Sequence, residues 1–161
     1  MWQPDPAGRK YLRAKETGAR MGKDFHGAKA AVFIGDNLLI YQRDRGVIWS
    51  GYWDFPGGGR EGDETPTECI KREVLEEFGL IVPDSSIVWG RGVPAMFDRN
   101  AVAWFFVIQL PQGAQHAVRF GVEGQRWALS PLDDVMNMPN LIPALLDRLT
   151  LWLRAMSSDR I

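Results

Sequence analysis

Apolar residues in the first half of the chain occur in short runs separated by turn-forming residues. Residues 30–34 and 38–42 flank the tripeptide Gly35-Asp36-Asn37, an arrangement that predicts a β-hairpin. A third strand is expected at residues 52–55, shortly after this hairpin. Further strands are expected where apolar runs return after a glycine cluster, at residues 87–89, 101–110 and 125–129.

Two other segments repeat their apolar residues at helical spacing. The first begins with Thr65, Pro66 and Glu68, which fit an N-terminal capping box, and it ends at Gly79. The second covers residues 141–156, and its large apolar side chains share one face that we expect to pack in the core. Strands, a helix, further strands and a final helix predict a layered α+β fold.

The chain has the length of one domain with an N-terminal extension. Residues 1–23 carry six basic side chains against two acidic ones, with few large apolar residues. We therefore expect residues 1–27 to form a basic arm that is flexible or loosely docked, and residues 28–161 to form a single domain. Exchange between two copies in a homodimer and attraction of anions are alternative roles for this arm.

Composition narrows the classes of partner. Nineteen basic residues against twenty acidic ones give a net charge of −1, which argues against binding of duplex nucleic acid as the main role. The apolar run at residues 101–108 is too short to cross a bilayer, so no membrane partner is expected. The single cysteine, Cys69, cannot form an internal disulfide, which favours a cytoplasmic location.

Three acidic residues share one face of the first predicted helix. Glu73, Glu76 and Glu77 stand at positions i, i+3 and i+4, so their carboxylates converge within one turn. Such a face is often only a solvated surface. Beside the triple glycine of residues 57–59, however, these oxygens are a candidate site for Mg²⁺ or Mn²⁺.

The whole segment has a recognisable order. It consists of Gly58, five residues, Glu64, seven residues and then Arg72-Glu73-Val74-Leu75-Glu76-Glu77-Phe78-Gly79-Leu80. This order resembles the Nudix box without a mismatch, and the hairpin and the segment before the box extend the resemblance over residues 28–156. The resemblance implies a Nudix fold, with a mixed β-sheet sandwiched between helices, and hydrolysis of a nucleoside diphosphate linked to another group.

The resemblance also implies roles for individual residues. Arg72 would orient the carboxylates of the box, and Glu64 would be a secondary ligand or a supporting acid. Glu123, which precedes the last predicted strand, is our candidate for a further metal ligand and for the general base; Glu73 and Glu76 are alternative bases, and Glu123 could instead be an exposed turn residue. The implied metal ligands are the carbonyl of Gly57 and the side chains of Glu73, Glu76, Glu77 and Glu123.

Four residues are candidates for contact with the substrate. Arg43 ends the second predicted strand, where related triphosphate hydrolases place an arginine that contacts phosphate. Arg99 precedes a strand in a segment that looks like the corresponding one in hydrolases of oxidised guanine nucleotides, and Gly58 belongs to the glycine cluster. Asn140 matches an asparagine that reads the purine edge in that group, although it could equally be a helix N-cap.

The sequence thus predicts a Mg²⁺-dependent pyrophosphohydrolase with a nucleotide as its partner. A purine nucleoside triphosphate, including an 8-oxo form, is the favoured substrate. Hydrolysis of ADP-ribose or of a dinucleotide polyphosphate is an alternative. A Nudix-like module that senses a nucleotide without catalysis is the alternative from another class.

Overall fold

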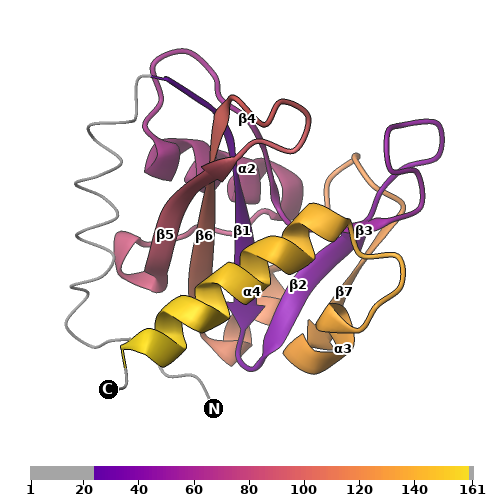
Figure 1. Ribbon diagram of the computed structural model, residues 1–161. Coiled ribbons are helices and arrows are strands. Elements are labelled where there is room, and N and C mark those ends of the chain that lie inside the picture. Colours follow the sequence, from indigo (N-terminus) through magenta and orange to yellow (C-terminus); the bar gives the residue numbers. More distant parts are fainter. Residues whose placement is uncertain (1–23, 160–161) are drawn as a thin grey trace.

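The computed structural model describes residues 24–159, which form one mixed β-sheet with helices on both faces (Figure 1). The strands are β1 (Phe25–Ile34), β2 (Asn37–Gln42), β3 (Trp53–Asp54), β4 (Gly57–Gly59), β5 (Ile87–Pro94), β6 (Val102–Leu110) and β7 (Arg126–Pro131). The helices are α2 (Pro66–Phe78), α3 (Leu132–Met136) and α4 (Pro143–Ser158), and short 3₁₀ turns lie at Asp84–Ser86 and Gln112–Ala117.

The strand order is β3-β2-β1-β6-β5, and β4 and β7 join this path at β1 and β2. β1 and β6 run parallel, whereas the other strand pairs are antiparallel, which confirms the expected mixed sheet. β1 and β2 pair only beside their connecting turn, at Phe33↔Leu38 and Ile34↔Asn37. Farther from the turn, β1 pairs with β4 while β2 pairs with β3, so the sheet is forked at that end. β7 pairs with β2 along the whole strand.

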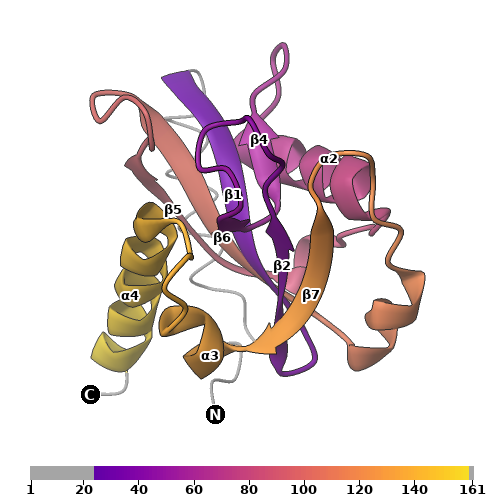
Figure 2. The ribbon, with the colours of Figure 1, turned by 90° about the vertical axis from the view of Figure 1, so that its right-hand side faces the viewer.

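Each face of the sheet is covered by a helix that contributes to its own hydrophobic cluster (Figure 2). On one face, Ile70, Val74 and Phe78 of α2 pack against β1 and β6. On the other face, Leu145, Leu149 and Trp152 of α4 are fully buried, as their helical spacing predicted. The sandwich of a mixed sheet between helices is therefore confirmed.

Local sequence signals define both ends of α2. The amide of Glu68 donates to Oγ1 of Thr65 at 3.2 Å, and the amide of Thr65 donates to the Glu68 carboxylate at 3.4 Å. At the other end, Gly79 adopts a left-handed conformation with φ of 67° and donates its amide hydrogen to the carbonyl of Leu75. The capping box and the glycine terminator are both confirmed, and they fix the register of the acidic face.

β4 is an element that the sequence pattern did not predict, because glycine has low strand propensity. It forms because glycine backbones can approach closely: a Cβ added to Gly27 would lie 2.4 Å from the carbonyl oxygen of Gly58. The short helix α3 was also not predicted. β5 extends five residues beyond its predicted end at residue 89, through Gly90, Gly92 and Pro94, which interrupt the apolar pattern.

The N-terminal boundary also differs from expectation. β1 begins at Phe25, so residues 25–27 belong to the sheet although the sequence assigned them to the basic arm. Residues 1–23, with all six basic side chains of that arm, lie outside the described residues. In the part of the chain that the structure describes, no helix is both long enough and apolar enough to span a bilayer.

Candidate active site

A buried carboxylate joins three strands at the fork of the sheet. Asp54 of β3 is fully buried and forms ion pairs with Lys29 of β1 and Arg43 after β2, each at 2.9 Å. The hydroxyl of Tyr41 also donates to Asp54, at 3.2 Å. Burial alone would raise the pKa of Asp54, but the charge and hydrogen bonds of Lys29, the Phe55 amide and Arg43 hold this pKa below its ordinary value.

Arg43 has a second anchor in the loop that follows β2. Its Nε donates to the carbonyl oxygen of Ile48 at 2.8 Å, while its Nη1 donates to Asp54. These contacts hold the guanidinium in a defined position at the edge of the loop that carries Trp49. Arg43 is thereby a fixed donor at the strand end where the sequence placed it.

A hydrogen bond connects the acidic helix to the glycine segment. The amide of Gly57 donates to Oε1 of Glu77 at 2.7 Å, and Glu77 is buried. Burial raises the pKa of Glu77 to about 8, and the nearby charges of Glu73 and Asp54 act in the same direction against the lowering effects of Lys29 and the Gly57 amide. The positive charge around Glu77 is thus too small to offset the cost of burying its ionised carboxylate.

The glycine at position 58 leaves room for a second carboxylate. A Cβ at Gly58 would lie 2.6 Å from Oε1 of Glu73, so any side chain there would displace this glutamate. Partial burial raises the pKa of Glu73, despite hydrogen bonding from Arg72. Glu76, one turn along the same face, is more exposed, with 56% of its side-chain surface accessible.

The guanidinium of Arg72 connects the acidic residues of the box to the glycine segment. It donates to the carboxylates of Glu64, Glu73 and Glu76 and to the carbonyl of Gly59. Its hydrogen bond with Glu64 raises the pKa of the guanidinium and lowers the pKa of Glu64. One planar guanidinium thus restrains three carboxylates at once, and the orienting role expected for Arg72 stays a prediction.

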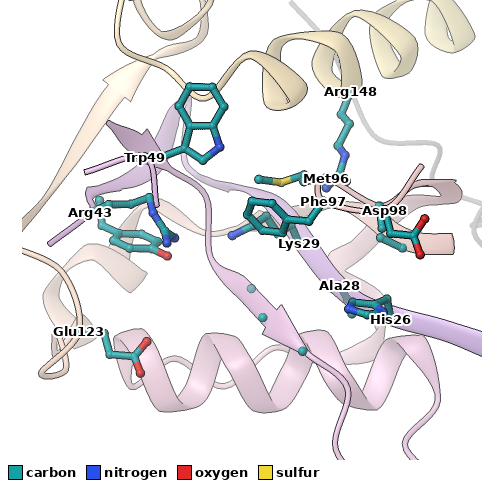
Figure 3. Close-up of a pocket in the computed structure, with 17 residues that line it drawn as sticks. His26, Ala28, Lys29, Arg43, Trp49, Met96, Phe97, Asp98, Glu123 and Arg148 are labelled. Carbon is teal, nitrogen blue, oxygen red and sulfur yellow. The ribbon is translucent and has the colours of Figure 1, made fainter. Parts of the chain in front are cut away.

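A pocket of about 330 Å³ opens at the fork beside the glycine segment (Figure 3). Among the residues that line it are Lys29, Arg43, Trp49, Gly57, Gly58, Phe97, Glu123 and Arg148. The volume lies in the range of small-molecule sites. The pocket thus contains cationic, aromatic and backbone groups close together.

The structure brings together only some of the residues proposed for this site. Glu123 is exposed and lines the pocket, at the opposite end of the close-up from Arg148 (Figure 3). Arg99 is exposed and lines a neighbouring pocket between β5 and α4, without lining the one that contains Arg43. Asn140 lines neither pocket.

Asn140 is not the helix cap that the sequence allowed. The N-cap of α4 is Ile142, and Pro143 occupies the first turn, because Leu141 extends the chain in a bridge to Trp53. The carbonyl of Asn140 accepts a hydrogen bond from the amide of Trp53 at 2.8 Å, and its side-chain amide reaches the carbonyl of Gly51 at 3.5 Å. The N-cap alternative is therefore wrong.

Sequence reasoning assigned no role to Lys29, Asp54, Phe97 or Arg148. Lys29 and Asp54 are distant in sequence and join only when β3 folds beside β2. A signal for Arg148 did exist: it lies three residues after Leu145 and four before Trp152, on the buried face of α4. A charged residue at a core position is a functional candidate, because an isolated buried charge is costly.

The carboxylate oxygens of this site are the type of ligand that a hard divalent cation prefers. Glu77 and Glu73 are buried or half-buried carboxylates with raised pKa values, a condition that a cation would relieve. Gly58 provides the space that Glu73 occupies. Within residues 24–159, however, no three acidic, histidine or cysteine side chains are already arranged as a metal site, and Arg72 holds Glu73 and Glu76.

Comparison with known proteins identifies the family. The profile of the NUDIX domain matches residues 24–153. This chain belongs to the Nudix family. The segment from Gly58 to Leu80, with its carboxylates on α2, is accordingly its Nudix box.

Two curated relatives carry different names. An RNA pyrophosphohydrolase of Aeromonas hydrophila subsp. hydrophila is 28% identical over 109 residues, which are 54% of this Nudix chain and 61% of the relative. An 8-oxo-dGTP diphosphatase of Proteus vulgaris is 38% identical over 53 residues, which are 33% of this chain and 47% of the relative. The chain thus spans less than two thirds of the length of either relative.

Solved structures of other proteins show a similar fold at low sequence identity. A MutT protein from Methanosarcina mazei Go1 superposes with a TM-score of 0.59 and 20% identity, covering 83% of this chain and 96% of the other. A bifunctional NMN adenylyltransferase/ADP ribose pyrophosphatase from Francisella tularensis, complexed with AMP and a manganese ion, gives a TM-score of 0.63 and 18% identity. That match covers 93% of this chain and 48% of the neighbour.

Proposed function

We propose that this Nudix chain is a divalent-metal-dependent hydrolase of a pyrophosphate bond in a nucleoside diphosphate linked to a second group. A purine nucleoside triphosphate is the favoured substrate. The observation that carries the proposal is the contact between the Gly57 amide and Glu77, because it brings the carboxylates of the Nudix box to the loop that lines the pocket.

The proposed metal ligands are Glu73, Glu76, Glu77 and the carbonyl of Gly57. Mg²⁺ or Mn²⁺ held there would neutralise diphosphate charge and orient the attacking water. Arg72 restrains Glu73 and Glu76 through hydrogen bonds, so it positions these side chains without contacting the substrate. Glu123 is the proposed further ligand or general base, which is supported by its place on the pocket wall.

Lys29 and Arg43 are proposed to bind the phosphates. Both cations share one carboxylate, Asp54, so this trio has a net positive charge at the pocket. Arg43 is held by Asp54 and by the Ile48 carbonyl, which preorients its other N–H groups. A fixed guanidinium is suited to a phosphate oxygen on which negative charge develops during cleavage.

The test is hydrolysis of a panel of nucleotides in Mg²⁺ or Mn²⁺. GTP, ATP, CTP, UTP, 8-oxo-dGTP, ADP-ribose, diadenosine tetraphosphate and 5′-triphosphorylated RNA would be compared by product release. The panel includes the substrates in the names of the two relatives. We expect a nucleoside triphosphate to yield the monophosphate and pyrophosphate, with purines hydrolysed fastest.

Two controls make this test decisive. A chelator should abolish hydrolysis, and fresh divalent metal should restore it. Tight nucleotide binding without any turnover would favour the sensing module over the enzyme. Fastest turnover of ADP-ribose or of the dinucleotide would keep the chemistry and replace the proposed substrate.

We propose the cytoplasm as the location, since Cys69, a lone cysteine, is buried inside α2.

A further inference from the structure

Arg148 is a buried cation that the proposed phosphate chemistry does not use. It lies on α4 with only 5% of its surface exposed, beside the fully buried Leu145 and Leu149. Its Nη2 donates to the carbonyl oxygen of Pro94 at 3.1 Å. Among residues 24–159, no carboxylate lies within ion-pair distance of its guanidinium.

This arrangement favours a ligand over a purely structural role. Burial lowers the pKa of Arg148, and the more distant charge of Asp54 offsets this only in part. A guanidinium has five N–H donors and no acceptor, and Pro94 is its one hydrogen-bond partner in the described chain. Desolvated donors of this kind destabilise the fold unless acceptors reach them. Arg148 lines both this pocket and the neighbouring one between β5 and α4, and the pocket beside the glycine segment is the one that a nucleotide bound there would fill.

The position of Arg148 in the pocket indicates which part of a nucleotide it meets. The glycine segment is tied to α2 on one face of the sheet, whereas α4 packs on the other face. Figure 3 shows Arg148 extending from α4 towards Met96 and Phe97, with Trp49 on the neighbouring wall. A nucleotide whose phosphates lie at the glycine segment would therefore direct its base towards these apolar side chains and Arg148.

Lys29 and Arg43, the two cations proposed to bind phosphate, share the carboxylate of Asp54. Lys29 also donates to the carbonyl of Phe55, and Arg43 also donates to the carbonyl of Ile48. Within the described part of the chain, Arg148 has no such anion. The N–H groups of Arg148 are thus available to the hydrogen-bond acceptors of an uncharged base.

We propose that Arg148 is a specificity-determining residue that recognises the O6 and N7 acceptors of a 6-oxopurine, so that the pocket prefers guanine to adenine nucleotides. Guanine presents two adjacent acceptors, which match the fork of a guanidinium. Adenine presents an amino donor beside N7, which opposes a residue that can only donate. This inference rests on the proposed function, since it assumes that a nucleotide occupies the pocket.

The base edge supplies a graded set of probes. Hypoxanthine keeps both acceptors, so ITP should behave like GTP. 7-Deaza-GTP lacks the N7 acceptor, and 8-oxo-dGTP carries a hydrogen on N7, so each should lose one of the two hydrogen bonds. We expect kcat/KM to follow the order GTP and ITP, then 7-deaza-GTP, then ATP, with GTP at least roughly tenfold above ATP.

The variants are R148M, which removes the donors at similar volume, and R148K, which keeps the charge without the fork. R148M should abolish the preference for GTP over ATP by lowering kcat/KM for GTP while changing that for ATP little. R148K should restore only part of the preference. The matched control is R154M, an exposed arginine on the same helix, which should leave the ratio unchanged.

Three results would overturn the assignment. An equal loss for all nucleotides in R148M would show that Arg148 contacts phosphate. An unchanged GTP-to-ATP ratio would show that Arg148 does not contact the base, and collapse of the ratio in N140A alone would assign base reading to Asn140. A thermal melt is a control for folding: R148M should be at least as stable as the parent, because it removes a buried charge.

Failure of the proposed function can be separated from failure of this inference. If the parent protein hydrolyses no nucleotide, the same variants would be tested by calorimetric binding of non-hydrolysable GTP and ATP analogues. A GTP preference in binding that R148M removes would support the role of Arg148 without catalysis. Equal binding of both analogues to the parent would refute it.

Discussion

Glu77 accepts a hydrogen bond from the amide of Gly57 at 2.7 Å, and this contact connects the C-terminal end of the acidic face of α2 to β4. The two residues are twenty positions apart, and the capping box at Thr65 sets the helix register that makes them meet. The position of these carboxylates, beside the glycine segment that lines the pocket, thus depends on a local signal at the start of the helix.

Removal of charge from the acidic face tests the proposed metal ligands. Glu77→Gln keeps an acceptor for the Gly57 amide but removes the negative charge, so the fold should persist while Mg²⁺-dependent turnover falls by orders of magnitude. Glu76→Gln should have a similar effect. The measurement is kcat with a parallel far-UV circular dichroism spectrum.

The matched control is Asp63→Asn in the exposed loop before α2, which should retain turnover. A second readout is thermal: Mg²⁺ should raise the melting temperature of the parent and have little effect on Glu77→Gln. Near-normal rates in both glutamine variants would refute the assignment of these ligands.

Asp54→Asn should destabilise the protein strongly. It leaves Lys29 and Arg43 without their shared counter-charge at a fully buried position, for which a cost of about 3 kcal/mol in the free energy of unfolding is expected. Urea unfolding at neutral pH measures this cost. A loss below 1 kcal/mol would show that water or rearranged side chains replace the carboxylate.

The same residue gives a pH dependence of defined sign. Because the pKa of Asp54 is lower in the folded protein than its ordinary value of 3.8, the unfolded chain binds more protons at acidic pH. Its contribution is fully present at neutral pH and is lost as pH falls through the folded-state pKa. The difference in unfolding free energy between the parent and Asp54→Asn should therefore shrink below about pH 4. A difference that stays constant down to pH 2 would contradict this linkage.

Arg43→Ala should reduce kcat/KM for every nucleotide that is hydrolysed. The lost guanidinium would contact phosphate, which all substrates share, so the ranking of bases should remain the same. The comparison is Arg91→Ala, an exposed arginine on β5 that should change little. Equal effects of the two substitutions would refute the placement of Arg43 at the phosphates.

Thr65→Ala should lower stability by about 1 kcal/mol, because the amide of Glu68 loses its side-chain acceptor. For a domain of this size, the melting temperature should fall by roughly 2–4 °C. Thr150→Ala is the control: its hydroxyl donates to the carbonyl of Leu146 inside α4, and its loss should not be destabilising. Equal melting temperatures for Thr65→Ala and the parent would show that the cap contributes nothing.

The sequence predicted what depends on near neighbours in the chain. The capping box, the acidic face and the core stripe of α4 all repeat within one or two helical turns, and the structure confirms them. The Asp54 network could not be predicted in this way, because Lys29 and Asp54 meet only through sheet pairing. The location of Arg99 also depends on tertiary structure. Its position before β6 did not reveal that it lines the neighbouring pocket and not the one that contains Arg43.

The two hydrophobic clusters on opposite faces of the sheet support different parts of the proposed site. The proposed metal ligands Glu73, Glu76 and Glu77 lie on α2, whose buried residues belong to one cluster, whereas Arg148 lies on α4, whose buried residues belong to the other. Substitutions at well-separated positions tend to have additive effects. Substitutions of side chains packed beneath α4 should therefore change the proposed base preference while having little effect on the proposed metal ligands of α2.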